Sequence, residues 1–199
     1  MNQAQREQLD RGDAVRREFT VILDTHIDEL FEFHYMISSY FAEEAQGKEY
    51  SRRPPLGFRL CGIGEPLTRI AVRPAWHYGK KVLDPHSITM ETLVERNQGK
   101  RDGKQVFRIS HDFSIVLTAN DWRWTSFSHT NAIDGAERIV EVVQSFLMCR
   151  DDVFARSKTH CSICGRALTD DQSRTRGIGP ECIKKTRFLE VLSTQSVLA

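Results

Sequence analysis

The sequence lacks a strong charge of either sign. Its 199 residues carry 28 Lys and Arg against 27 Asp and Glu, so the formal net charge is +1. The whole molecule is therefore not a polyelectrolyte, and any attraction to nucleic acid has to come from a local patch of basic residues. With 40% hydrophobic and 28% charged residues, the composition is that of a globular protein rather than a disordered one.

Long hydrophobic runs are also absent. No stretch approaches the roughly 18 consecutive apolar residues that a membrane-spanning helix needs. The N-terminal sequence MNQAQREQLDRGDAVRREF is polar and has no apolar segment of the kind found in signal peptides. We therefore expect a cytoplasmic protein that has no membrane partner, and thiols stay reduced in that compartment.

Motifs of the common enzyme classes are missing as well. The SFSHT stretch has no flanking glycines of a nucleophile elbow, and GIGEP is not followed by the Lys-Ser/Thr of a phosphate-binding loop. The histidines at positions 77 and 86 have no nucleophile at a recognisable spacing. These absences favour a non-enzymatic protein over an enzyme that acts on nucleotides or nucleic acid.

The pattern of apolar residues predicts an α+β fold. From Phe19 onward, apolar residues recur every three or four positions, which predicts a long N-terminal amphipathic helix of about seven turns that ends near residue 45. Its apolar stripe is broad enough to pack on its own chain or on a second copy, so the helix is a candidate homo-oligomer contact. Residues 3–18 can also be helical, although they have no apolar face of their own.

The middle of the chain predicts a small antiparallel sheet backed by a helix. Short β-prone segments between residues 56 and 130 are split by Gly and Pro. The stretch SITMETLVERNQ is ambiguous and could be a short helix capped by Ser87, while NQGKRDGK is typical of a turn or exposed loop. Two strands joined at 119–121 follow, with Trp122 and Trp124 on one face, either in the core or as a platform for stacking bases. An apolar stripe predicts the helix over 132–149.

Four segments follow from these boundaries. We expect an N-terminal helical segment at 1–50, an α+β domain at 55–152, a zinc-binding module at 155–190 and a tail at 191–199. The tail and the end of the module contain KKTRFLEVLSTQSVLA, which predicts a short helix followed by loose chain.

The five cysteines are odd in number and clustered, which favours a metal site over a disulfide framework. Cys161 and Cys164 have the C-x-x-C spacing of a zinc knuckle, in which a tight turn points two thiolates at one ion. Cys182 follows the rigid turn Gly-Ile-Gly-Pro and is the expected third ligand. The alternative is that these cysteines are simply reduced and buried.

The fourth zinc ligand stays open at this stage. His160 is the first candidate, although a ligand next to Cys161 in the chain is geometrically awkward. Asp170 or Asp171 could supply an oxygen, Cys149 could reach the module if the preceding helix packs against it, and a water molecule is a further alternative.

The cluster also carries a resemblance. The stretch CSICGRALTDDQSRTRGIGPEC, residues 161–182, resembles a small Cys-rich domain of unknown function found in bacteriophage and actinobacterial proteins, with the recurring pattern C-x-x-C-G-R-x-L-T-D, then S, then R-G-I-G-P-x-C. The family usually has Pro after the aspartate, where this chain has Asp171. The resemblance implies a metal-binding module of phage or prophage origin, and so a place in the host cytoplasm, but it implies no reaction.

Basic residues gather around the same cysteines. Residues 158–187 carry an excess of four positive charges on a nearly neutral chain. Basic groups beside a zinc knuckle suit contact with phosphates, whereas the alternative is a solvated face that maintains solubility. The candidate nucleic-acid contacts are Arg166, Arg174, Arg176, Lys184 and Lys185.

Together these observations favour a non-enzymatic, zinc-containing binding protein, phage-related, that contacts nucleic acid through its basic C-terminal module. The alternative is a phage-type protein–protein inhibitor or regulator that occupies a host defence complex and holds a purely structural zinc. The lack of catalytic motifs and the near-zero net charge motivate that alternative.

Overall fold

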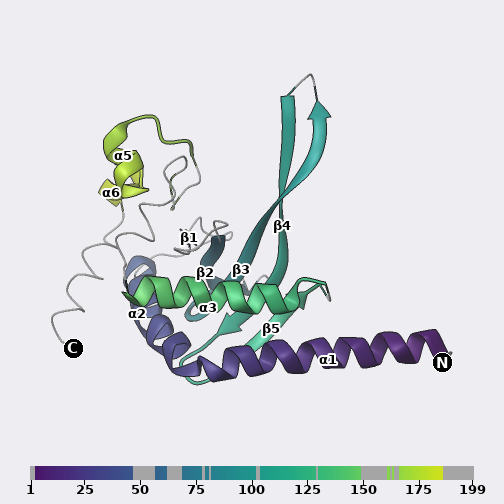
Figure 1. The fold of residues 1–199 in the computed structure, drawn as a ribbon. Coiled ribbons are helices and arrows are strands. Elements are labelled where there is room, and N and C mark those ends of the chain that lie inside the picture. The colour runs from purple at the N-terminus through teal and green to yellow at the C-terminus, as the bar shows by residue number, and fades with distance from the viewer. Residues whose placement is uncertain are drawn as a thin grey trace.

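The described residues form an α+β fold, as the sequence predicts (Figure 1). The computed structural model describes residues 3–46, 57–61, 69–77, 79–80, 82–101, 104–128, 130–148, 161, 163 and 166–185. Its elements are α1 (Gln3–Thr25), α2 (Ile27–Ala45), β1 (Phe58–Cys61), β2 (Arg69–His77), β3 (Val82–Arg101), β4 (Lys104–Leu117), β5 (Trp122–Phe127), α3 (Ala132–Met148), α5 (Asp171–Arg176) and α6 (Pro180–Lys185). The predicted helix over 132–149 is confirmed as α3.

The sheet is an antiparallel meander in which each strand pairs with the next one along the chain, in the order β1-β2-β3-β4-β5. The predicted strand pair around 119–121 is confirmed, because β4 and β5 are joined by a turn in which the Thr118 amide donates to the Asp121 carbonyl at 2.8 Å. Figure 1 shows α3 lying across the sheet, with α1 and α2 on the same side.

The ambiguous stretch SITMETLVERNQ is a strand rather than a short helix, because it lies within β3. Burial alternates along it: Ile88, Met90 and Thr92 are buried, at 0%, 0% and 1% exposure. A period of two puts all three on one face of a strand. The NQGKRDGK stretch, predicted as a turn or exposed loop, is mostly strand, since β3 continues to Arg101 and β4 begins at Lys104. The connection itself, residues 102–103, lies outside the described residues.

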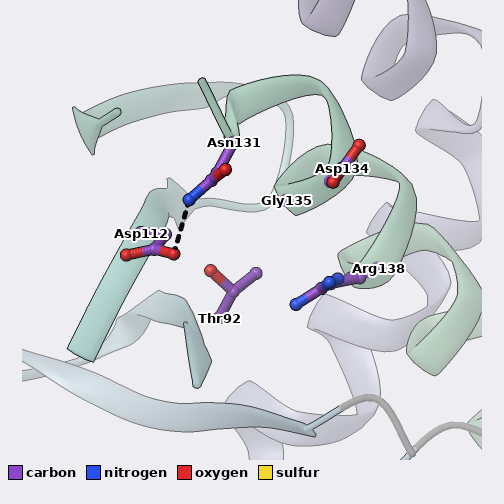
Figure 2. A pocket seen from close by; sticks show the side chains of 6 residues that line it. All are labelled: Thr92, Asp112, Asn131, Asp134, Gly135 and Arg138. Atoms are coloured by element: carbon purple, nitrogen blue, oxygen red, sulfur yellow. Dashed lines mark hydrogen bonds between the residues drawn. The ribbon is translucent and has the colours of Figure 1, made fainter. Parts of the chain in front are cut away.

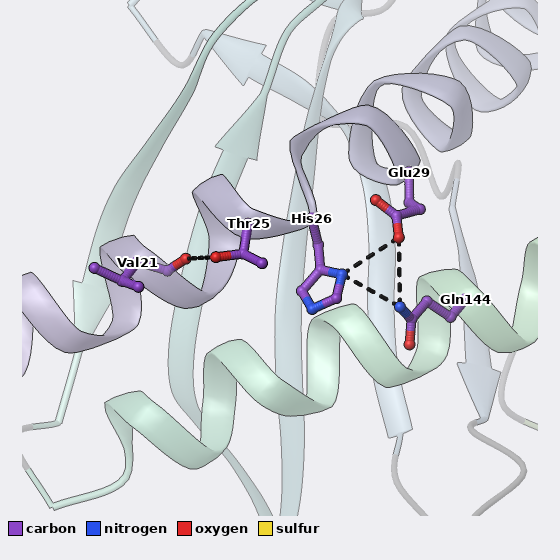
Figure 3. Close-up of polar contacts among 5 residues, drawn as sticks. All are labelled: Val21, Thr25, His26, Glu29 and Gln144. Atoms are coloured by element: carbon purple, nitrogen blue, oxygen red, sulfur yellow. Dashed lines mark hydrogen bonds and ion pairs between the residues drawn. The ribbon is translucent and has the colours of Figure 1, made fainter.

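The long N-terminal helix is divided at His26, which the apolar periodicity does not reveal. The backbone of His26 (φ −112°, ψ 27°) separates α1 from α2. Its Nδ1 lies 3.3 Å from Glu29 Oε1 on α2 and 3.3 Å from Gln144 Nε2 on α3 (Figure 3). A helix that bends keeps its 3.6-residue period on both sides, so the pattern gives no sign of the break.

The bend lets both helices contribute to the hydrophobic core. In α1, the ring of Phe19 meets Phe113 of β4 edge-on with centroids 5.1 Å apart. In α2, the ring of Phe33 meets Phe146 of α3 in the same manner, also at 5.1 Å. All four rings are fully buried. The N-terminal helices therefore cover the sheet of their own chain.

Helix α3 approaches the sheet most closely at Gly135. A Cβ atom built on Gly135 would lie 2.3 Å from the Cβ and 2.8 Å from the Cγ of Phe113. Both residues are buried. Only a glycine fits at this contact, so the sequence I-D-G-A-E sets how closely α3 packs on β4.

Helix α2 carries a buried histidine that is hydrogen-bonded to the β3 backbone. His34 is only 4% exposed, and its Nε2 lies 2.9 Å from the carbonyl oxygen of His86. A carbonyl only accepts hydrogen bonds, so Nε2 carries the proton and donates it. Burial lowers the pKa of His34 from its ordinary value, and the hydrogen bond to His86 opposes that effect in part.

We expect the free energy of unfolding to fall as the pH drops below about 6.5, the pKa of a histidine in an unfolded chain. Below that pH the unfolded chain binds a proton that folded His34 resists, so acid favours the unfolded state. For each unit by which the folded pKa of His34 lies below the unfolded value, acid lowers the free energy of unfolding by up to about 1.4 kcal/mol. Urea unfolding at neutral and mildly acidic pH should show a smaller decrease in stability for His34→Gln than for the wild type. His77→Gln, at an exposed position, should keep the wild-type decrease; an unchanged decrease in His34→Gln would contradict this account.

None of the helices in the described part of the chain combines the length and the apolar character that crossing a membrane requires.

Candidate metal module and nucleic-acid interface

Cys161 is fixed at both its backbone and its sulfur. Its amide donates to the carbonyl of Arg166 at 2.8 Å, which closes the loop that contains the C-x-x-C sequence. Its Sγ accepts the amide N–H of Gly179 at 3.4 Å, and the residue is 1% exposed. These two contacts hold the Cys161 sulfur in one position, as a metal ligand requires.

Gly179 also contacts the backbone of Cys182, the third predicted ligand. The amides of Cys182 and Ile183 both donate to the Gly179 carbonyl at 3.0 Å, at the start of α6. Gly179 thus donates to the sulfur of Cys161 and accepts from the backbone of Cys182. The turn therefore links the sulfur of Cys161 to the backbone of a cysteine that lies 21 positions further along the sequence.

The module has very few apolar residues of its own. Among its described residues, the buried side chains are Cys161, Leu168, Ser173 and Ile178, with exposures between 1% and 6%. A core of this size does not offset the conformational entropy of ordering the segment. Metal ligation commonly replaces such a core in small cysteine-containing modules, and the thiol set fits zinc.

Three of the predicted ligands, Cys164, His160 and Cys149, lie outside the described residues. The choice of a fourth ligand among His160, Asp170, Asp171, Cys149 and water therefore stays a prediction. Within the ranges that the structure describes, no three His, Cys, Asp or Glu side chains form a group able to hold a metal ion. Cys161 and Cys182 are thus the two predicted cysteine ligands whose surroundings are described.

The two candidate aspartates start helix α5. Asp170 Oδ1 accepts the amide of Ser173 at 2.7 Å and so caps the helix. Asp171 Oδ1 lies 3.8 Å from the guanidinium of Arg174 on an exposed surface. Gly177 ends the helix in the left-handed conformation, with φ 68°. The T-D-D-x-S and R-G spacing is therefore explained by helix capping.

The predicted nucleic-acid contacts occupy α5, α6 and the loop before them. Arg166 and Lys184 are exposed. Arg174 differs from them, because its Nε donates to the carbonyl of Leu168 at 3.1 Å and ties α5 to the preceding loop. Arg176 and Lys185 are the last residues of α5 and α6. Arg174 thus has a structural contact in addition to its charge.

Both tryptophans of β5 contact side chains of helix α1. Trp122 Nε1 donates to Asp24 Oδ1 at 2.8 Å, and the guanidinium carbon of Arg16 lies 5.2 Å from the ring centroid of Trp124. Trp124 is still 41% exposed. These contacts favour packing between helix and sheet over a platform for stacking bases.

Sequence reasoning missed a small polar pocket where α3 begins. Asp112 at 6% exposure accepts a hydrogen bond from Asn131 Nδ2 at 2.8 Å, and Arg138 and Thr92 face the same space (Figure 2). The cavity measures about 140 Å³, whereas sites for nucleotide-sized ligands span roughly 300–1,000 Å³. It has room for water or a small ion. No sequence signal joins these residues, because they come from two strands and a helix.

The fold and the module together define an α+β protein with a small C-terminal cysteine module. Residues 151–187 match a family of unknown function (DUF6011). This match confirms the resemblance to a small domain of unknown function, and it identifies that segment rather than the whole chain. No curated protein and no solved structure matches the sequence.

Proposed function

We propose that this chain is a non-enzymatic, zinc-containing binding protein, phage-related, that contacts nucleic acid through its basic C-terminal module. The observation that carries the proposal is the charge of that module. Residues 158–187 hold seven Lys and Arg against three Asp and Glu, and the side chains of Arg166 and Lys184 are exposed.

Zinc fits this proposal as a structural ion. It would be held by Cys161, Cys164 and Cys182 with His160 as the fourth ligand, and it would order the short helices that carry the basic residues. The amide of Gly179 and the closed loop at Cys161 support this assignment because they fix the position of the Cys161 sulfur. The module would then present its charges on a fixed frame, which lowers the entropy cost of binding.

Neutralising four basic residues of the module should weaken nucleic-acid binding. The variant combines Arg166→Gln, Arg176→Gln, Lys184→Gln and Lys185→Gln, and it leaves Arg174 in place because Arg174 holds the loop of Leu168. The logarithm of the affinity falls linearly with the logarithm of the salt concentration. Each phosphate that the protein no longer neutralises makes the magnitude of that slope smaller by about 0.9. We expect the magnitude of the slope to decrease by up to about 3.6, so that binding depends less on salt. The affinity should decrease by roughly ten- to a hundredfold at moderate salt.

A matched variant elsewhere on the chain controls for overall charge. Arg11, Arg17, Lys80 and Arg123 lie outside the module, and replacing them with Gln removes the same four charges. This control should bind nearly as well as the wild type. Equal decreases in affinity for the two variants, or no decrease for the module variant, would remove the module from the proposed interface.

A further inference from the structure

Strands β3 and β4 continue together past the rest of the sheet. The pairing of β2 with β3 ends at Thr92, and the pairing of β4 with β5 begins at Phe113. Between those points, residues 93–101 and 104–111 pair only with each other in the described sheet. Figure 1 shows this β3–β4 arm standing clear of the three helices. At about 3.3 Å per residue, its β3 side is roughly 26 Å long.

The arm is basic, and its ladder places like charges opposite one another. Residues 93–111 hold five Lys and Arg against one Glu and one Asp. Arg96 is paired with Arg108, and Arg101 is paired with Lys104. In the described ladder, no basic position of the arm is directly opposed by a carboxylate. Like charges in opposed positions destabilise a strand pair, and a two-stranded ribbon without further support is marginally stable in water.

Positive charge is concentrated in two segments of the chain, the arm and residues 158–187, while the remaining residues are net acidic. The arm has an excess of three positive charges and residues 158–187 have an excess of four, while the chain as a whole is +1. All other residues together are therefore net negative by six. Two positive segments on an otherwise acidic chain suit a polyanionic partner that both segments contact.

We propose that the β3–β4 arm enters the major groove of double-stranded DNA. This inference rests on the proposed nucleic-acid binding and specifies the partner and a second contact. A two-stranded ribbon, with strands about 4.8 Å apart, fits a groove about 12 Å wide. The register shift between Asn97 and Lys100 marks a bulge, which increases the twist of a ribbon. The major groove of duplex RNA is too narrow for side chains to read, so duplex RNA is excluded as the partner of the arm.

Two arm variants test the inference in the full, metal-loaded protein. The first combines Arg96→Gln, Lys100→Gln, Arg101→Gln and Lys104→Gln, which again removes four charges. The second replaces Val94–Ser110 with Asn-Gly, which joins the paired residues Leu93 and His111 by a two-residue hairpin turn. It keeps the pairing of β3 with β2 and of β4 with β5.

The readouts are the salt dependence of binding to a short DNA duplex and the methylation of guanine N7 by dimethyl sulfate, since N7 lies in the major groove. We expect the wild type to protect N7 and both arm variants to leave it unprotected. In both arm variants, the slope of log affinity against log salt should become smaller in magnitude, by about 0.9 for each phosphate that the arm no longer neutralises. Unchanged N7 protection in both arm variants would overturn the inference, as would wild-type binding to DNA without N7 protection.

The same set of variants separates this inference from the proposed function. If the module variant binds more weakly and the arm variants do not, the arm assignment fails and the proposed function stands. If only the arm variants show reduced affinity and no N7 protection, the arm assignment stands and the module assignment fails. A wild type that binds no DNA overturns the arm assignment outright. A dimer that forms without DNA and dissociates when the arm is excised would also overturn it, by showing that the arm holds a second copy of the chain.

Discussion

Replacing Cys161 with serine in the metal-loaded protein is expected to remove the bound zinc and to unfold the C-terminal module. Serine has nearly the same shape as cysteine, but its hydroxyl is a poor zinc ligand and cannot replace a thiolate. Structural zinc sites contribute apparent binding energies of about 10–16 kcal/mol, whereas the module buries only a few apolar side chains such as Leu168 and Ile178. Zinc content should fall from about one ion per chain to none, and amide exchange should accelerate across residues 166–185.

Cys182→Ser should give the same result, since both sulfurs belong to the proposed site. Cys61→Ser supplies the matched control: Cys61 is a thiol on strand β1, outside the module, and its replacement should leave the zinc content unchanged. The zinc assignment would be wrong if Cys161→Ser retained a full complement of zinc or if the wild type bound none. In the second case the module would be held by its hydrogen bonds and small core alone.

The Gly135→Ala substitution is expected to destabilise the fold by roughly 2 kcal/mol, because it forces α3 away from β4. In an ordinary helix interior the same change stabilises by about 1 kcal/mol. Here the new Cβ would lie 2.3 Å from the Cβ of Phe113, a distance at which one backbone has to move. Because the clash involves Cβ itself, shortening Phe113 to alanine would not relieve it.

Gly79→Ala gives the comparison that isolates this effect. No heavy atom lies within 4 Å of a Cβ built on Gly79, so the change should alter the free energy of unfolding by less than about 0.5 kcal/mol. Urea unfolding curves of the two variants provide the measurement. A Gly135→Ala protein as stable as the wild type would show that the packing distance between α3 and β4 is greater than the structure indicates.

The sequence predicts the elements whose pattern is local. Helix α3 and the pair β4–β5 are indicated by periodicity and by the polar turn between the strands. The break at His26 is not, because a bent amphipathic helix and a straight one share one period. The stretch SITMETLVERNQ in the middle of β3 stays ambiguous in the sequence because its residues mix Ile, Met, Leu and Val, whose burial depends on β2 and β4 rather than on neighbours in the chain.

The candidate sites also include features that are local in the sequence and features that depend on the fold. The cysteine spacing and the local charge of residues 158–187 are local features, so the sequence alone identifies the module and its resemblance to a family of unknown function. The contact of Gly179 with Cys161, the pocket at Asp112 and the β3–β4 arm all depend on which distant segments meet. Composition predicts a turn or an exposed loop over 97–104, whereas strand pairing places Lys100, Arg101 and Lys104 in a two-stranded ribbon.

Binding of the zinc-loaded protein to labelled duplex DNA, single-stranded DNA and RNA at two salt concentrations tests the central claim most directly. We expect binding at low salt that weakens steeply as salt increases, with a preference for duplex DNA, because the proposed contacts are phosphates and a major groove. Binding to none of the three at low salt would contradict the account. The basic module would then be a solvated surface around a structural zinc, and a host protein complex would be the partner to seek.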